Sequence, residues 1–226
     1  MNALSVLARI LATVSSQLDA VRVGTRPPTE EELADWRDLE PGSDVLAAQG
    51  ARPAGPGAAA NFYQATWAAP SIDVNGIRGG EPDLQKTVLP VEAVANVSVR
   101  LAPGQDPEEI AAVVECLFAE AAPPGAELTI ECWAVTPPGL APPDSRPLLL
   151  AREAFARVLG RPPVLIRSGG TLPIFPALTE RGIPVLLTGF DVPEGNAHAP
   201  NERLLCDYIP LGVTAAQETL SALAAL

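Results

Sequence analysis

One residue of this chain is well suited to bind a metal ion: His198, the only histidine among 226 residues. It lies in the segment Asn196-Ala-His-Ala-Pro-Asn-Glu202, in a predicted loop after an apolar run, where open α/β sheets usually carry site residues. Asn201 is predicted to cap the helix that follows, with Glu202 in its first turn. A hydrolytic zinc site needs about three protein ligands and a water molecule. His198 is therefore a candidate ligand that cannot complete such a site alone, and a lone histidine is more often structural.

Two other features could hold a carboxylate. Arg100 lies on the polar face of a predicted strand, where its guanidinium could clamp a carboxylate in bidentate fashion; a salt bridge at the rim explains it equally well. The segment Arg167-Ser-Gly-Gly-Thr-Leu-Pro173 joins a predicted strand to a helix, so its backbone N–H groups could bind an anion. A tight turn is the favoured interpretation of that segment alone. The sequence has no Gly-x-Ser-x-Gly elbow, phosphate loop or dinucleotide fingerprint, which argues against serine hydrolases and nucleotide-binding proteins.

The three cysteines, Cys116, Cys132 and Cys206, are odd in number and lack Cys-x-x-Cys spacing. This argues against a disulfide framework and against a thiolate zinc site. We expect small core residues of a reducing cytosol, and hence a cytoplasmic protein.

Charge and hydropathy exclude several partners. The formal net charge is −12, with no local cluster of Lys and Arg, so nucleic acid and anionic membrane surfaces are not expected to bind. No apolar run is long enough to span a membrane. The apolar segment 3–13 contains Arg9 and lacks a basic leader. Its apolar positions fall at helical spacing and predict an amphipathic helix: Leu4, Leu7, Ala8, Leu11, Val14 and Leu18.

Residues 1–135 are predicted to form a compact α+β layer. A Pro/Gly-rich insertion at 24–60 follows the first helix and contains a helix capped by Thr29, whose carboxylates Glu30 to Glu32 are expected to be solvated. The segment 71–77 alternates as a strand and breaks at Asn75-Gly76, and 91–101 alternates throughout. Asp106 as N-cap and Pro107 at the first position predict the next helix. A strand is expected at 127–134.

Residues 136–226 are predicted to follow a different pattern. A Pro-rich crossover leads to a helix at 147–159, a strand at 164–167, a helix ending at Arg181, a strand at 184–188, the His198 loop and a final helix. This alternation is typical of an α/β parallel sheet. Two strands are too few for a stable sheet, so the α/β segment is expected to be incomplete.

Five segments, taken together and in this order, resemble the zinc-dependent aminoacylase/carnosinase-type metallopeptidases, relatives of succinyl-diaminopimelate desuccinylase and glutamate carboxypeptidase. They are Asp73-Val-Asn-Gly-Ile-Arg-Gly-Gly80, Gln85-Lys-Thr-Val-Leu-Pro90, Ala95-Asn-Val-Ser-Val-Arg-Leu-Ala-Pro-Gly-Gln-Asp106, Ser168-Gly-Gly-Thr-Leu-Pro-Ile174 and Asn196-Ala-His-Ala-Pro-Asn-Glu202. The combination is specific, although no single segment is. Ala199 departs from the serine commonly found after the zinc histidine.

The resemblance implies an α+β, ferredoxin-like lid domain that forms a homodimer, followed by part of an αβα catalytic domain that carries two zinc ions. It further implies that His198 is a zinc ligand, that Arg100 and the Gly170-Thr171 turn hold the substrate carboxylate, and that Asn75 faces the cleft. The implied reaction is hydrolysis of an amide next to a free carboxylate, in a small peptide or an N-acyl amino acid.

The other ligands and the general base implied by the resemblance have no counterpart in the sequence. In such enzymes a His-x-Asp motif, a Glu-Glu pair and a transition-state-stabilising histidine precede the matching segments. We therefore expect the C-terminal part of a dipeptidase or amidohydrolase, inactive by itself and with no catalytic residue of its own. Two alternatives are a non-catalytic dimerisation or binding module and one half of a split enzyme completed in trans.

Overall fold

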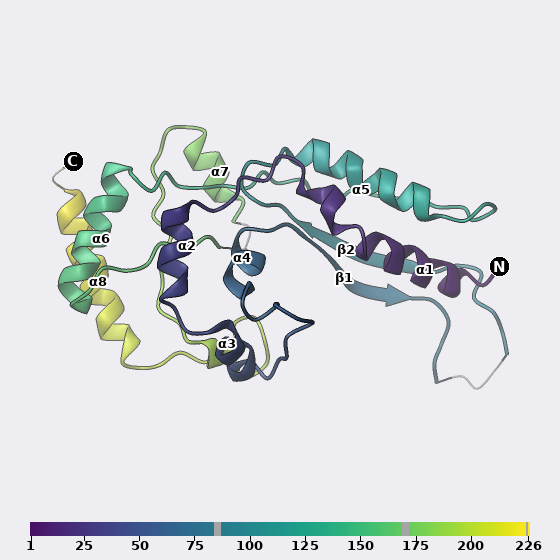
Figure 1. Cartoon of the computed structure of the whole chain (residues 1–226), viewed down its shortest axis with the longest axis horizontal. Helices are drawn as coiled ribbons and strands as arrows, with labels where there is room; N and C mark the ends of the chain where they lie inside the picture. Colours follow the sequence, from purple (N-terminus) through teal and green to yellow (C-terminus); the bar gives the residue numbers. More distant parts are fainter. Residues whose placement is uncertain (84–86, 169–171, 225) are drawn as a thin grey trace. The chain divides into compact units, whose positions relative to one another are not determined.

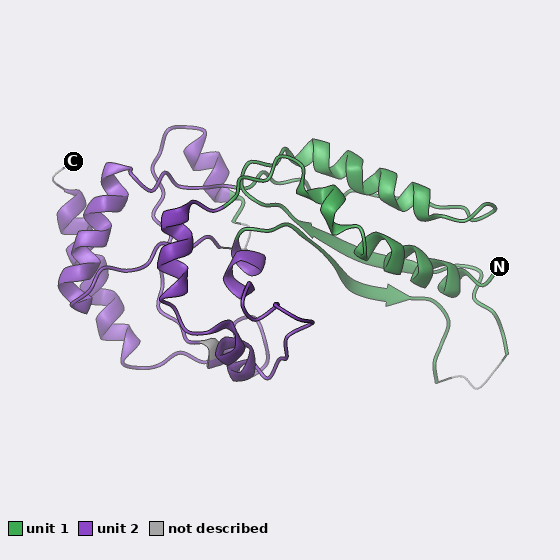
Figure 2. Cartoon of the chain, viewed as in Figure 1, with its two compact units in different colours: residues 1–27, 68–138, 169–173 green, residues 28–67, 139–168, 174–226 purple. Residues whose placement is uncertain are grey.

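The structure is a computed structural model that describes residues 1–83, 87–168, 172–224 and 226. The chain divides into two compact units (Figure 2). Unit 1 comprises residues 1–27, 68–138 and 169–173, and unit 2 comprises 28–67, 139–168 and 174–226. The predicted division into 1–135 and 136–226 stays a prediction.

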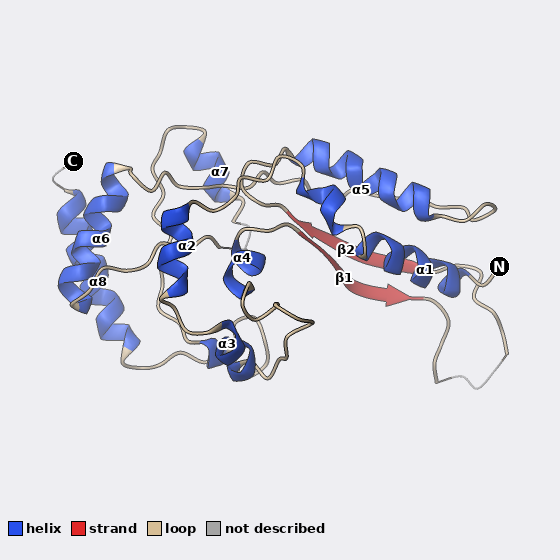
Figure 3. Ribbon diagram, viewed as in Figure 1, coloured by secondary structure: helices blue, strands red, loops and turns tan. Residues whose placement is uncertain are grey.

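In unit 1, two long helices cover one face of a two-stranded antiparallel sheet (Figures 1 and 3). The helices are α1 (Ala3–Ser15) and α5 (Pro107–Ala121), and the strands are β1 (Ser71–Arg78) and β2 (Val94–Arg100). The core between them consists of Ile10, Leu11, Val14, Val21, Ile72, Ile110, Leu117 and Phe118. Burial of these apolar side chains holds the layers together.

The predicted break at Asn75-Gly76 is a β-bulge inside β1. Ile72 pairs with Val99, Val74 with Val97 and Ile77 with Ala95, and the register shifts between Val74 and Gly76. Ala95, Val97 and Val99 pack against the core, and directly opposed residues share a face. The extra residue therefore shifts the alternation of side chains between the two faces by one position. As a result, Ile72, Val74 and Ile77 all point to the helix side.

The helix start predicted at Asp106 is confirmed. Asp106 caps α5, since its Oδ1 accepts hydrogen bonds from the N–H groups of Glu108 (2.9 Å) and Glu109 (3.0 Å). Just before it, buried Gln105 connects three segments of unit 1. Its Oε1 accepts from Ala102 N (2.7 Å), and its Nε2 donates to Val21 O (2.6 Å) and Val23 O (2.8 Å). These bonds fix the short 3-10 helix η1 (Leu18–Arg22) beside the end of β2.

Unit 2 contains helices from both halves of the chain: α2 (Glu30–Arg37), α3 (Gly42–Ala48), α4 (Phe62–Trp67), α6 (Arg146–Leu159), α7 (Ile174–Thr179), the 3-10 helix η2 (Pro193–Gly195) and α8 (Tyr208–Leu223). Helices α6 and α8 pack together (Figure 1). Phe190 lies beside both, since its ring centroid is 5.9 Å from that of Phe155 and 5.8 Å from that of Tyr208.

An aromatic cluster holds the three helices of residues 28–67 together. The rings of Trp36 and Trp67 meet edge to face at 5.3 Å, and Tyr63 lies 4.4 Å from Trp67. The Tyr63 hydroxyl donates to Glu40 O (2.7 Å). A Cβ at Gly42 would collide with the Phe62 side chain, so glycine is required where α3 meets α4. The Pro/Gly-rich insertion thus includes a helical cluster within unit 2.

Several sequence predictions about the strands and the core are wrong. No strand is present at 127–134, 164–167 or 184–188; among the described residues only β1 and β2 form a ladder. Apolar runs become strands only where another strand completes their hydrogen bonds. The three cysteines are exposed rather than in the core. On α1, Ala8 is exposed and Leu18 lies beyond the helix, whereas Ile10 is buried.

No helix in the described ranges is both long and apolar enough to cross a membrane.

Candidate functional site

The loop that carries His198 is closed by Arg203. The Arg203 backbone N–H donates to Gly195 O (2.9 Å), and its Nε donates to Glu194 O (2.9 Å). Within the loop, Ala199 N donates to Asn196 O (2.9 Å). Residues 195–203 therefore form a compact closed loop, with His198 exposed on it at a φ of 63°.

The predicted capping role of Asn201 is wrong. Helix α8 begins at Tyr208 with Asp207 at the N-cap position, so Asn201 and Glu202 lie well before it. Asn201 adopts a left-handed φ of 63°, which asparagine tolerates better than most residues. It belongs to the turns of the His198 loop instead.

The described residues do not fit a zinc ion by themselves. Nowhere in the ranges that the structure describes do three or more His, Cys, Asp or Glu side chains gather as a group that could hold a metal. A structural or hydrolytic zinc ion takes three or four protein ligands. His198 can supply one of them, and no reaction step through a metal follows from this chain.

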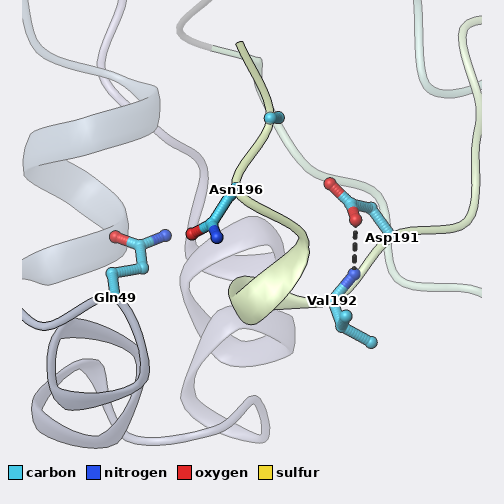
Figure 4. Close-up of a pocket in the computed structure, with 5 residues that line it drawn as sticks. Gln49, Asp191, Val192 and Asn196 are labelled. Carbon is cyan, nitrogen blue, oxygen red and sulfur yellow. Dashed lines mark hydrogen bonds between the residues drawn. The ribbon is translucent and has the colours of Figure 1, made fainter. Parts of the chain in front are cut away.

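A cavity of about 510 Å³ lies next to the His198 loop, lined by Gln49, Asp191, Val192, Asn196 and Ala197. The carboxamides of Gln49 and Asn196 face one another across it (Figure 4). Asp191 is oriented by its own backbone, because its Oδ1 accepts from Val192 N (2.8 Å). Helix α3, which Gln49 ends, contacts η2 of this loop. The spacing of residues in the sequence gave no signal for this cavity, because Gln49 and Asp191 are far apart in the chain.

Arg100 and Asn75 lie on the same two-stranded sheet but not side by side. Arg100 pairs with Ser71 at one end of the ladder, whereas Asn75 is the extra residue of the bulge, next to Gly76, which pairs with Asn96. Four residues of β2 separate these points, a distance of about 13 Å along the strand. Both residues are exposed, and Arg100 makes no ion pair with the described residues. Within the part of the chain that the structure describes, the rim salt bridge considered for Arg100 is therefore not formed.

Arg167 forms a buried ion pair that the sequence did not predict. Its Nε and Nη2 donate to the two carboxylate oxygens of Glu32, each at 2.8 Å, and its side chain is 3% exposed. Glu32 also accepts from Thr29 N (2.7 Å) as part of a capping box on α2. The expectation that Glu32 is solvated is therefore wrong. Gly170 and Thr171, predicted to hold a substrate carboxylate, lie outside the described residues.

The pKa of Glu32 is lowered from its ordinary value. Burial alone raises the pKa, but hydrogen bonds from Arg167 and Thr29 and the charge of Arg167 outweigh it. One turn further along α2, the Trp36 indole N–H donates to Leu165 O (3.1 Å). Glu32 and Trp36 thus dock α2 onto the segment that was predicted to be a strand.

The chain is similar to known proteins over most of its length. Residues 1–126 match the family model described as a peptidase dimerisation domain. Beta-Ala-His dipeptidase from Mus musculus is 29% identical over 147 residues, which is 61% of this chain and 29% of that protein. The corresponding human protein is 27% identical over 147 residues, 61% of this chain and 28% of that protein.

Solved structures show the same fold. An M20 family metallo-carboxypeptidase from Sulfolobus solfataricus has a TM-score of 0.81 at 22% identity, covering 100% of this chain and 53% of that one. Human carnosine dipeptidase 1 has a TM-score of 0.78 at 20% identity, covering 98% and 49%. A dipeptidase from Saccharomyces cerevisiae has a TM-score of 0.73 at 23% identity, covering 96% and 47%.

The chain thus spans about half the length of these solved structures, and its match spans 29% of the mouse relative. The family model covers more than half of the chain and falls on the residues that build unit 1 around α1, β1, β2 and α5. On this evidence the chain belongs to the M20 metallopeptidase family and carries its peptidase dimerisation domain.

Proposed function

We propose that this chain is the C-terminal part of a metal-dependent dipeptidase or amidohydrolase, and that it associates as a homodimer through its lid domain. In this proposal residues 1–135 are the ferredoxin-like lid, with the insertion at 24–60, and residues 136–226 are an incomplete part of the αβα catalytic domain. The helix-strand-strand-helix order of α1, β1, β2 and α5 supports the lid.

One end of the sheet in unit 1 supports the dimerisation proposal. Large apolar side chains are exposed at the end of the sheet where β1 leaves and β2 enters: Ile77, Val88, Leu89, Val91 and Val94, of which Val91 is 96% exposed. We call these five residues the hairpin surface. A two-stranded sheet is marginally stable on its own, and large exposed apolar side chains that gather in one region are typical of protein interfaces. A second copy of unit 1 would cover them.

The test is the molar mass in solution, measured by light scattering over a range of concentrations. We expect a dimer for the wild type and a shift toward monomer for Val91→Asp, because a carboxylate is costly to bury unpaired. Val23→Asp introduces the same charge on an exposed valine of unit 1 outside the hairpin surface, and should remain dimeric. A monomeric wild type at high concentration would contradict the proposal, as would a Val91→Asp variant that dimerises like the wild type.

The proposed substrate is a small peptide or an N-acyl amino acid whose amide lies next to a free carboxylate. In the complete site, His198 is proposed as one zinc ligand, Arg100 and the Gly170-Thr171 turn as carboxylate-binding groups, and Asn75 as a residue facing the cleft. The exposure of His198 and Arg100 and the absence of an ion pair on Arg100 in the described residues support these roles. Two zinc ions are proposed for the intact enzyme, in a cytoplasmic protein.

The chain alone is proposed to be inactive, because one imidazole cannot replace the remaining ligands and the general base. A metal-replete preparation should therefore not hydrolyse dipeptides above the rate of a His198→Ala control. Turnover that disappears in that control would contradict this part of the proposal.

A second candidate is a split enzyme completed in trans by a chain with the remaining ligands. One feature of unit 2 favours it. Ile209, Val213 and Leu220 are exposed on α8 at spacings of four and seven residues, which place them on one helix face. Co-purification of a chain carrying the His-x-Asp and Glu-Glu motifs, and its loss in Val213→Asp, would distinguish this candidate from a non-catalytic binding module.

A further inference from the structure

We propose that the cavity between the end of α3 and the 191–197 loop binds a primary ammonium group attached to an amide. This chemistry is shared by amino-acid amides and by the amino ends of peptides. The binding site consists of Asp191, Gln49 and Asn196. It requires neither a metal ion nor the proposed roles of His198 and Arg100.

The cavity has the size of a small-molecule site. Its volume of about 510 Å³ falls within the range of roughly 300–1,000 Å³ that ligand pockets occupy. Its lining residues flank two elements of unit 2 that are in contact, α3 and η2. Val192 and Ala197 line it beside the three polar residues, so it combines a small apolar surface with a few polar groups.

Asp191 supplies the negative charge. Its Oδ1 accepts from Val192 N (2.8 Å), while Oδ2 has no hydrogen bond or ion pair with the described residues. A Cβ at Gly195 would collide with Oδ1, so the glycine leaves room for the carboxylate in this orientation. A carboxylate with one oxygen fixed and the other available is suited to a charge-assisted hydrogen bond from an ammonium group.

Gln49 and Asn196 supply the groups for the amide. Neither side chain makes a hydrogen bond within the described part of the chain, and their carboxamides face each other in Figure 4. Each carboxamide offers a donor and an acceptor, which together match the N–H and C=O of one ligand amide. The backbone of Asn196 adopts a left-handed conformation, with a φ of 55°.

The charge of the surroundings selects cations over anions. No Lys or Arg lines the cavity, and the chain has a formal net charge of −12. The potential around such a protein attracts small cations and repels anions. A free carboxylate is therefore the least suitable ligand group for this cavity.

The test is a titration of the isotopically labelled chain with glycinamide, followed by the NMR shifts of the backbone amides of residues 49, 191, 192 and 194–197. We expect saturable shifts at these residues. N-Acetylglycinamide has the amide but no ammonium group, and should bind about tenfold more weakly or worse, because hydrogen bonds to charged groups contribute the larger share of the affinity.

Two variants complete the experiment. Asp191→Asn should weaken glycinamide binding about tenfold, whereas Asp144→Asn, the same change at an exposed site elsewhere in unit 2, should leave it unchanged. Gly195→Ala keeps the Asp191 carboxylate but displaces it, and should also weaken binding. The proposal is overturned if the folded wild type shows no saturable shifts, if N-acetylglycinamide binds equally well, or if Asp191→Asn binds like the wild type. None of these results depends on dimerisation or metal binding.

Discussion

The carboxylate of Glu32 and the guanidinium of Arg167 are joined by two hydrogen bonds of 2.8 Å in a site where the arginine side chain is 3% exposed. The same carboxylate completes the capping box of α2. This pair connects the insertion to a segment that lies 135 residues away in the sequence. The stability of unit 2 should therefore be sensitive to either partner.

Replacing Glu32 by Gln should lower the free energy of unfolding by about 3 kcal/mol, because it removes the negative charge that accepts two hydrogen bonds from the buried Arg167 guanidinium. Chemical denaturation monitored by tryptophan fluorescence is a suitable measurement, since Trp36 lies one turn along the same helix. Glu30→Gln is the matched control on the exposed start of α2, and should change stability by less than about 0.5 kcal/mol. Equal effects of both variants would contradict the role of the ion pair.

The contribution of Glu32 should depend on pH in a defined direction. Its pKa is lowered in the folded state, so the unfolded state takes up a proton first as the pH falls. The stabilisation is therefore fully present above the unfolded pKa of about 4.3, and is lost as the pH falls through the folded pKa.

Unfolding curves of the wild type and Glu32→Gln, measured from neutral pH downward, check this direction. The stability difference between the two proteins should be constant near neutral pH and should shrink below about pH 4.3. A difference that grows on acidification would show that the sign is wrong.

Gln105→Leu should destabilise unit 1 by about 2–3 kcal/mol. The substitution removes three hydrogen bonds, and it leaves the buried carbonyl of Val21 and the partly buried carbonyl of Val23 without this donor. Gln17→Leu, on an exposed glutamine whose side chain makes no cap hydrogen bond, is the control and should be nearly neutral. The measurement is thermal unfolding by circular dichroism. A neutral Gln105→Leu would mean that these contacts contribute nothing to stability.

Arg203→Ala should loosen the loop that carries His198 without unfolding the protein. The substitution removes the Nε bond to Glu194 O, and a lost hydrogen bond of this kind corresponds to about a fivefold faster local opening. Hydrogen exchange of the backbone amides at 195, 199 and 203 is the measurement. Arg161→Ala, at an exposed site after α6, should leave those rates unchanged. Unchanged rates in Arg203→Ala would contradict its closing role.

Much of unit 1 could be predicted from the sequence, because its signals are local. Asp106 and Pro107 mark a helix start through capping chemistry alone, and the alternation at 95–101 gives the core face of β2 directly. The break at Asn75-Gly76 could also be predicted, but its effect on which face of the sheet the following side chains occupy could not. Only the cross-strand register shows that the extra residue keeps Ile77 on the helix side.

Unit 2 was less predictable, because its contacts join distant parts of the chain. A run such as 164–167 has the apolar composition of a strand, but its state depends on whether another strand lies beside it. In this structure the carbonyl of Leu165 accepts from the Trp36 indole instead. Neither this contact nor the Glu32–Arg167 pair leaves a signal in residue spacing. The prediction that the three cysteines lie in the core was also wrong, because residue type alone does not decide the place of a small thiol, which is tolerated both in the core and on the surface.

We propose that this chain contributes the dimerisation surface and a single metal ligand, and that it does not form a hydrolytic site by itself. The most direct test is the zinc content per chain, measured by elemental analysis after dialysis against trace zinc. The account predicts clearly substoichiometric zinc, unchanged in His198→Ala. Stoichiometric zinc that is lost in His198→Ala would contradict it, because a complete site would then assemble from these residues.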